Sequence, residues 1–165
     1  MTRSYPLFYK ACLSLLLTAA LMLTASPAMA GERKAVFHVD FADPNRYSLT
    51  LTSINNLIND AENDLRDWDV HLVFVGLGMR FIAEGDVSGT PYAEDEELAE
   101  MRSNLNGRLR NLMDNRGLQV SLCEITRNEV DIADDEFFDG VEFVRSGVGY
   151  IADLQADGYA YLKIW

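Results

Sequence analysis

The stretch Ala35-Val36-Phe37-His38-Val39-Asp40-Phe41, followed by Asp43 and Pro44, decides the fold class. Its seven residues form a short, mostly apolar run rich in side chains that favour β-strands. Asp43 is suited to cap a helix, and Pro44 to occupy the first helical position. From Tyr47 to Leu65, apolar residues then recur at spacings of three and four, which is typical of one buried helix face. The sequence therefore predicts a strand that leads directly into a helix.

The same alternation of strand and helix continues to the end of the chain. Further strands are expected at residues 70–75, 118–123, 141–144 and 159–164, and helices at 79–83, 98–113, 124–130 and 146–156. Residues 84–92 contain two glycines and a proline without any period, which indicates a surface loop or a small insertion. Because each crossover contains a helix, we expect an α/β fold: a three-layer α/β/α sandwich with a mostly parallel five-stranded sheet.

Composition excludes several classes of protein. The chain has 165 residues, of which 48% are hydrophobic, and a formal net charge of -12. This apolar fraction is too high for a disordered chain, and two cysteines are too few for a disulfide scaffold. The negative charge repels phosphate backbones, so nucleic acid is not an expected partner.

The first thirty residues are typical of a secretory signal peptide. Arg3 and Lys10 precede an apolar run at 11–24, and Ala28-Met29-Ala30 offers small residues for cleavage. The run is shorter than the roughly 20 residues that a membrane-spanning helix needs, which disfavours an uncleaved anchor. We therefore predict cleavage after Ala30, a periplasmic or otherwise exported protein, a single domain at 31–165, and no stable membrane anchor.

Cleavage would leave Cys123 as the only thiol of the mature protein, because Cys12 lies in the signal. Cys123 is then a reactive thiol, a partner in an intermolecular bond, or a buried inert side chain. It is expected at the start of a helix, where unpaired N–H groups and the helix dipole favour the thiolate. Arg127, one turn later, would add to this effect, whereas the adjacent Glu124 would oppose it. The sequence does not show which of these opposing effects on the Cys123 thiolate is larger.

Candidate crevice residues follow from the rule that ligands of such sheets bind at the carboxyl ends of the strands. Besides Cys123 and Arg145, the rule selects Asp40, Asp43, Gly76, Gly78, Ser146 and Gly147. Asp43 and Ser146 each have an alternative explanation as a helix cap. The pair Gly76 and Gly78 lacks the third glycine of a dinucleotide-binding fingerprint, so no organic cofactor is expected.

The two histidines give little support to a metal or catalytic site. His38 lies within an apolar strand, which favours a core histidine over a ligand or a base. His71 is expected at the end of its strand opposite the crevice. With no histidine pair at helical spacing and one mature cysteine, a closed zinc site is not expected.

Three stretches of the chain resemble a known family. They are Lys34-Ala35-Val36-Phe37-His38-Val39, Gly117-Leu118-Gln119-Val120-Ser121-Leu122-Cys123, and Ser146-Gly147-Val148 together with residues 154–163. They look like the exported branch of the DsrE/DsrF-like family, and the C-terminal stretch is the most specific of them. Exported relatives usually follow the cysteine with Gly-Asn-Thr-Leu and basic residues, and of this pattern only Thr126 is present.

The resemblance implies an α/β/α fold and assembly into dimers, trimers or hexamers. It also implies a role for Cys123, which matches the cysteine that carries sulfur as a persulfide in sulfur-relay members. Large apolar side chains in an acidic chain, at Phe137, Phe138 and Trp165, would suit a subunit interface or would equally fold back on the core.

The leading hypothesis is a sulfur-handling protein that carries or transfers sulfane sulfur on Cys123. Arg127 and Arg145 would stabilise the thiolate, and a thiol-bearing protein would serve as sulfur donor or acceptor. Whether this amounts to enzymatic catalysis is left open. Two alternatives remain: a non-catalytic oligomeric module that binds a small ligand, and a thiol redox sensor that forms an intermolecular disulfide.

Overall fold

The computed structural model describes residues 31–165. The predicted signal peptide, with its cleavage site at Ala28-Met29-Ala30, lies outside the described residues. Glu32 to Trp165 form one compact unit. Within the described range, no helix is both long and apolar enough to cross a membrane.

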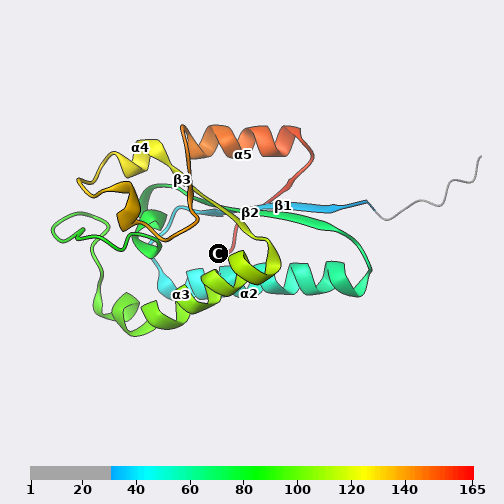
Figure 1. Ribbon diagram of the computed structural model, residues 1–165, viewed down its shortest axis with the longest axis horizontal. Helices are drawn as coiled ribbons and strands as arrows, with labels where there is room; N and C mark the ends of the chain where they lie inside the picture. The colour runs from blue at the N-terminus through cyan, green and yellow to red at the C-terminus, as the bar shows by residue number, and fades with distance from the viewer. Residues whose placement is uncertain (1–30) are drawn as a thin grey trace, which may run out of the picture. The chain divides into compact units, whose positions relative to one another are not determined.

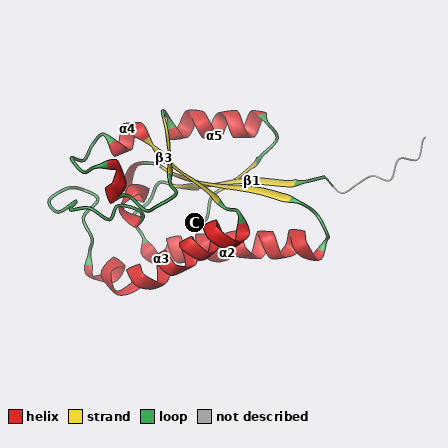
Figure 2. Cartoon of the chain, viewed as in Figure 1, coloured by secondary structure: helices red, strands yellow, loops and turns green. Residues whose placement is uncertain are grey.

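Strands and helices alternate in the predicted order, as the colouring of Figure 2 shows. The sheet contains β1 (Arg33–Val39), β2 (Trp68–Phe74), β3 (Gln119–Cys123), β4 (Glu142–Val144) and β5 (Ala160–Leu162). The helices are α2 (Pro44–Asn63), α3 (Glu96–Arg116), α4 (Glu124–Arg127) and α5 (Gly147–Ala156), with short 3₁₀ helices η1 (Gly76–Phe81) and η2 (Asp134–Glu136).

All five strands are parallel, in the order β4-β3-β2-β1-β5. Helices α2 and α3 cover one face of this sheet, and α5 lies on the other (Figure 1). The predicted three-layer α/β fold is therefore confirmed. In this topology the carboxyl ends of all five strands meet at one edge, which brings β3, η1, α4 and the start of α5 together.

The sequence of β1 is a nearly continuous apolar run because both faces of this strand are buried. Ala35, Phe37 and Val39 face the large core beneath α2 and α3, whereas Val36 belongs to a smaller cluster beneath α5. Asp43 begins α2 as predicted, because its carboxylate accepts a hydrogen bond from the Arg46 N–H at 3.0 Å.

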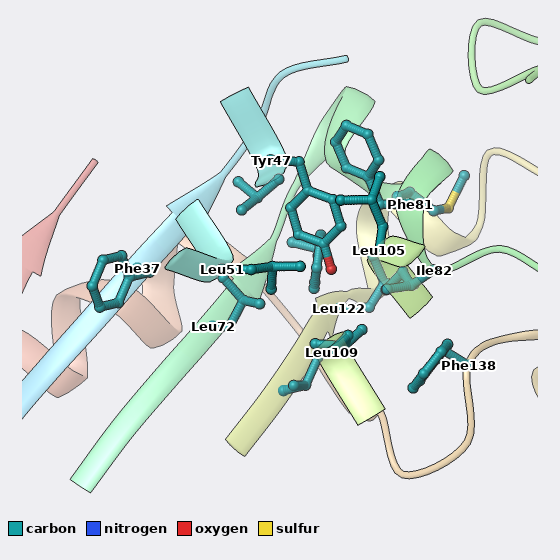
Figure 3. Close-up of a cluster of buried hydrophobic side chains, with 14 of the residues drawn as sticks. Phe37, Tyr47, Leu51, Leu72, Phe81, Ile82, Leu105, Leu109, Leu122 and Phe138 are labelled. Atoms are coloured by element: carbon teal, nitrogen blue, oxygen red, sulfur yellow. The ribbon is translucent and has the colours of Figure 1, made fainter. Parts of the chain in front are cut away.

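The large core gathers aromatic and aliphatic side chains from the strands, α2, α3 and η1 (Figure 3). The rings of Tyr47 and Phe81 stack with their centroids 4.3 Å apart. Phe138 enters this core because the chain after η2 turns back, and its N–H donates to the carbonyl of Ile82 at 2.8 Å. Phe137 is buried as well. Of the two alternatives for these phenylalanines, packing against the core is the one that the structure shows, whereas Trp165 is 86% exposed.

Two helices differ from their predicted boundaries, because local hydrogen bonds decide where each helix begins and ends. The helix predicted at 124–130 is only four residues long, since Glu129 and Val130 donate to carbonyls three residues back and form turns instead. The helix predicted at 79–83 is the 3₁₀ helix η1 and begins at Gly76, whose φ of +52° suits glycine. Residues 84–92 contain neither helix nor strand, as predicted.

Candidate functional site

Cys123 is the last residue of β3 and the N-cap of α4. This position places its side chain at the carboxyl edge of the sheet, where the sequence predicts a site. The residue is only 4% exposed, and it is the only cysteine in the described range. The thiol is thus at the predicted location but beneath the surface.

Four groups lower the pKa of the Cys123 thiol through hydrogen bonding: the backbone N–H groups of Gly147, Thr126 and Ile125, and the Thr126 hydroxyl. Burial raises the pKa of the Cys123 thiol, but these hydrogen bonds outweigh burial and leave the pKa below its ordinary value. Donors of this kind stabilise a thiolate without any positively charged side chain.

A hydrogen bond from Gly76 orients the Thr126 hydroxyl. Thr126 is buried, and its Oγ1 accepts from the Gly76 N–H at 2.9 Å. Because that oxygen already accepts one hydrogen bond, its own proton is free to point at the Cys123 sulfur. Gly76, Thr126 and Cys123 therefore form a short chain of donors that ends on the sulfur.

Gly147 can reach Cys123 because it has no side chain. A Cβ atom at this position would lie 2.6 Å from Val75 Cγ2 and 3.0 Å from Cys123 Cβ. Contacts this short would push the first turn of α5 away from the sheet. Glycine at 147 thus allows a helical N–H to approach the sulfur. Gly78 has a comparable role at the neighbouring strand, since a Cβ there would lie 2.1 Å from the Val39 carbonyl oxygen.

The two predicted arginines occupy different surroundings. Arg127 binds the acidic loop after α4, with Nε donating to Asp134 at 2.8 Å and Nη2 to the carbonyl of Ile132 at 3.0 Å. Arg145 is exposed and lines a pocket of about 320 Å³ together with Ser146 and Tyr150. The groups that lower the pKa of Cys123 are backbone amides and a hydroxyl, and no arginine is among them.

The predicted acids lie apart from the thiol, because they follow β1, two strands away from β3. Asp40 pairs with Lys163 at 2.7 Å. Burial raises the pKa of Asp40, but Lys163 and His38 together hold it below its usual range. Asp43 and Ser146 are both helix caps, and Ser146 accepts from the Gly149 N–H at 3.2 Å.

The histidines are hydrogen-bonded side chains on the α5 face of the sheet. His38 is half-buried, and its Nδ1 lies 3.0 Å from the Tyr161 hydroxyl. His71 is 4% exposed, with Nδ1 at 3.1 Å from the Tyr150 hydroxyl and Nε2 at 3.3 Å from Asp69. Burial lowers the pKa of both histidines. Among residues 31–165, no group of three or more His, Cys, Asp or Glu side chains is arranged to hold a metal ion.

Two further features of this edge are roles that the sequence does not specify, although the stretch 76–80, which ends at Arg80, follows the second strand where a crevice is expected. The first is the role of Thr126, for which the only signal was its match to the pattern of exported relatives. The second is Arg80, a buried side chain that donates to the carbonyls of Ala42 at 3.1 Å and Ala93 at 2.8 Å. Arg80 thereby ties the segment after β1 to the segment before α3.

Comparisons with known proteins give one family and related folds. A model of the DsrE/DsrF-like family matches residues 34–164. Six chains of solved structures match, among them protein MTH1491 from Methanobacterium thermoautotrophicum, whose function is described as unknown. It is 26% identical, with a TM-score of 0.57, and the match covers 80% of this chain and 99% of that one. The comparison with curated proteins gave no match.

Proposed function

Because the chain belongs to the DsrE/DsrF-like family, which is generally implicated in sulfur relay, we propose that Cys123 carries sulfane sulfur as a persulfide. The observation that carries this proposal is the place of Cys123 at the end of β3 and the start of α4, against the backbone of Gly147, where hydrogen bonding from three backbone amides and the Thr126 hydroxyl lowers its pKa. Such donors favour a nucleophilic thiolate at a position where burial alone would favour an inert thiol.

The transfer chemistry balances without an external oxidant. The Cys123 thiolate attacks the outer sulfur of a donor persulfide, R–S–SH, and forms a new S–S bond. The bond between the two donor sulfurs breaks, its electron pair leaves with R–S⁻, and the proton stays on the outer sulfur. In the second step an acceptor thiolate attacks that outer sulfur and releases the Cys123 thiolate. The same donors that stabilise the thiolate also stabilise it as the leaving group.

Burial sets a condition on this chemistry. Because Cys123 is only 4% exposed, we expect a donor to reach its sulfur through a local opening of the fold. Sulfur loading is therefore expected to be slower than reaction of a free thiol of the same pKa. Arg145, exposed in the nearby pocket, is suited to attract an anionic polysulfide or persulfide to this edge.

The location of the protein and its self-association are further parts of the proposal. We propose an exported protein on the basis of the signal-like residues 1–30, and self-association on the basis of the family resemblance. The donor and the acceptor are expected to be thiol compounds or thiol-bearing proteins.

Sulfur loading and transfer test the proposal. The protein is incubated with polysulfide and freed of excess reagent, and its sulfane sulfur is measured as thiocyanate after reaction with cyanide. We expect stoichiometric loading that disappears on addition of an acceptor thiol, with none in Cys123→Ser. Equal loading of both proteins would contradict the proposal.

The burial of Cys123 favours one alternative function, a non-catalytic binding module in which the cysteine only packs in the fold. This alternative predicts negligible alkylation of the folded protein at any pH and prompt alkylation after unfolding. A sensor that forms an intermolecular disulfide needs a second sulfur at about 2 Å, as the sulfur carrier does, but it also needs the backbone of a partner protein close to this buried residue, which the burial disfavours. A disulfide-linked band on nonreducing electrophoresis would support the sensor hypothesis.

A further inference from the structure

A second set of contacts between β3 and α5 lies directly beside the Cys123–Gly147 contact. Ser121 precedes Cys123 by two residues, so both side chains face α5. Tyr150 follows Gly147 by one helical turn. The Ser121 hydroxyl acts on the Tyr150 hydroxyl and lowers its pKa. The start of α5 is therefore held on β3 at two successive points.

Tyr150 is held from a second strand as well. Its hydroxyl lies 3.1 Å from Nδ1 of His71 on β2, and Nε2 of that ring lies 3.3 Å from Asp69. Asp69 also accepts from Gln119 at 2.8 Å and from the Tyr159 hydroxyl at 2.5 Å. The network thus spans two strands beneath α5.

One assignment of donors and acceptors satisfies every hydrogen bond of this network. The Ser121 hydroxyl donates to the Tyr150 oxygen, the Tyr150 hydroxyl donates to Nδ1 of His71, and Nε2–H of the neutral ring donates to Asp69. Burial and the nearby Glu142 raise the pKa of Tyr150, so its hydroxyl keeps its proton at neutral pH. Burial lowers the pKa of His71 despite Asp69 and Glu142, which favours the neutral ring that this order requires.

We propose that Tyr150 is a positioning residue: its hydroxyl, hydrogen-bonded to His71 on β2, fixes the first turn of α5 so that the Gly147 backbone stays against Cys123. This inference rests on the proposed function for its relevance, because it concerns the thiolate that would carry the sulfur. Tyr150 acts through the helix and does not touch the sulfur, so its removal changes the ionisation of Cys123 only by displacing the Gly147 N–H.

The test compares three variants that each lose one hydroxyl of the network. Tyr150→Phe removes the proposed anchor, and Ser121→Ala removes its partner on β3 while keeping the tyrosine. Tyr159→Phe is the matched control, because it removes an equivalent tyrosine hydroxyl from Asp69 beyond the far end of α5. Alkylation of Cys123 by iodoacetamide is measured across pH by mass spectrometry, and each curve is normalised to its plateau at high pH.

We expect Tyr150→Phe and Ser121→Ala to shift the alkylation curve to higher pH, while Tyr159→Phe follows the wild type. On the acidic side of the curve the normalised rate should fall about three- to tenfold, the effect of one weakened hydrogen bond. A merely structural loosening would raise the plateau, since it exposes the thiol, but would not move the midpoint.

Two results would overturn the inference: midpoints of Tyr150→Phe and Ser121→Ala equal to that of the wild type, or an equal shift in Tyr159→Phe. If Tyr150→Phe does not fold, Ser121→Ala decides alone. Failure of the proposed function looks different, because it leaves the wild type without sulfur loading whatever the midpoints of the variants. A shifted midpoint in Tyr150→Phe together with absent loading would keep the positioning role and reject the sulfur carrier.

Discussion

Replacement of Thr126 by valine isolates the contribution of one side-chain donor to the Cys123 thiolate. Valine matches threonine in shape, and Thr126 is buried, so the main change is loss of the hydroxyl. Two hydrogen bonds disappear: the one that the hydroxyl donates to the sulfur, and the one that it accepts from the Gly76 N–H at 2.9 Å.

Each lost bond has its own expected magnitude. A hydrogen bond to a charged group is worth about 1.5–3 kcal/mol, so the thiolate should lose roughly a tenfold to hundredfold advantage over the thiol. Gly76 is left with an unsatisfied N–H, which should lower the free energy of unfolding by about 1–3 kcal/mol. The variant should therefore be both less stable and less reactive at neutral pH.

The assay combines chemical denaturation with the pH profile of Cys123 alkylation. Thr126→Ser is the control, because it retains the hydroxyl and should retain the low midpoint. A Thr126→Val profile with the same midpoint as the wild type would refute the assignment of this hydroxyl to the thiolate. A shifted midpoint in Thr126→Ser as large as that in Thr126→Val would show that packing, rather than the hydroxyl, matters.

Gly147→Ala should lower the free energy of unfolding by about 1–3 kcal/mol, because its Cβ would lie 2.6 Å from Val75. Gly107→Ala in α3 is the control: it has open space around it and should raise the free energy of unfolding by about 0.5–1 kcal/mol. Denaturation curves of both variants check this, and similar effects in the two would show that the close contact at Gly147 is not real. Arg80→Met should cost about 2 kcal/mol or more, because two backbone carbonyls lose their donor; a neutral result would mean that water replaces the guanidinium. Acid should also destabilise the protein: the pKa values of His38 and His71 are lowered from the ordinary 6.5, so the unfolded chain binds more protons and stability falls as the pH drops below about 6.5. Unfolding free energies at about pH 7.5 and about pH 5.5 measure this slope, and a flat profile would contradict buried neutral histidines.

The sequence predicts the fold well because the signals for this sheet are local. The run in β1 is apolar on both faces, and Asp43 with Pro44 marks the start of α2 within a few residues. The ends of elements are less predictable, because tertiary hydrogen bonds decide them. Phe137 and Phe138 show the limit: within an acidic stretch they suggest an exposed anchor, yet a turn back to Ile82 buries both.

The location of the candidate site and part of its chemistry were predictable. Cys123 follows from strand order and the rule for carboxyl ends. The sequence suggested that N–H groups at the start of the following helix stabilise the thiolate, and that Arg127 and Arg145 add to this effect. Arg127 is instead bound to Asp134, and the sulfur receives amides from Gly147 and Ile125. The N–H groups of the helix after Cys123 follow from the sequence, whereas the Gly147 amide comes from α5, so only the three-dimensional structure identifies it.

The most direct test of the account is the mass of Cys123 in the protein isolated from its own cells without reductant, determined by peptide mapping before and after exposure to polysulfide. The account predicts one or more added sulfur atoms on the peptide that contains Cys123, removable by reductant and increased by polysulfide. An unmodified Cys123 that also fails to take up sulfur from polysulfide would contradict it.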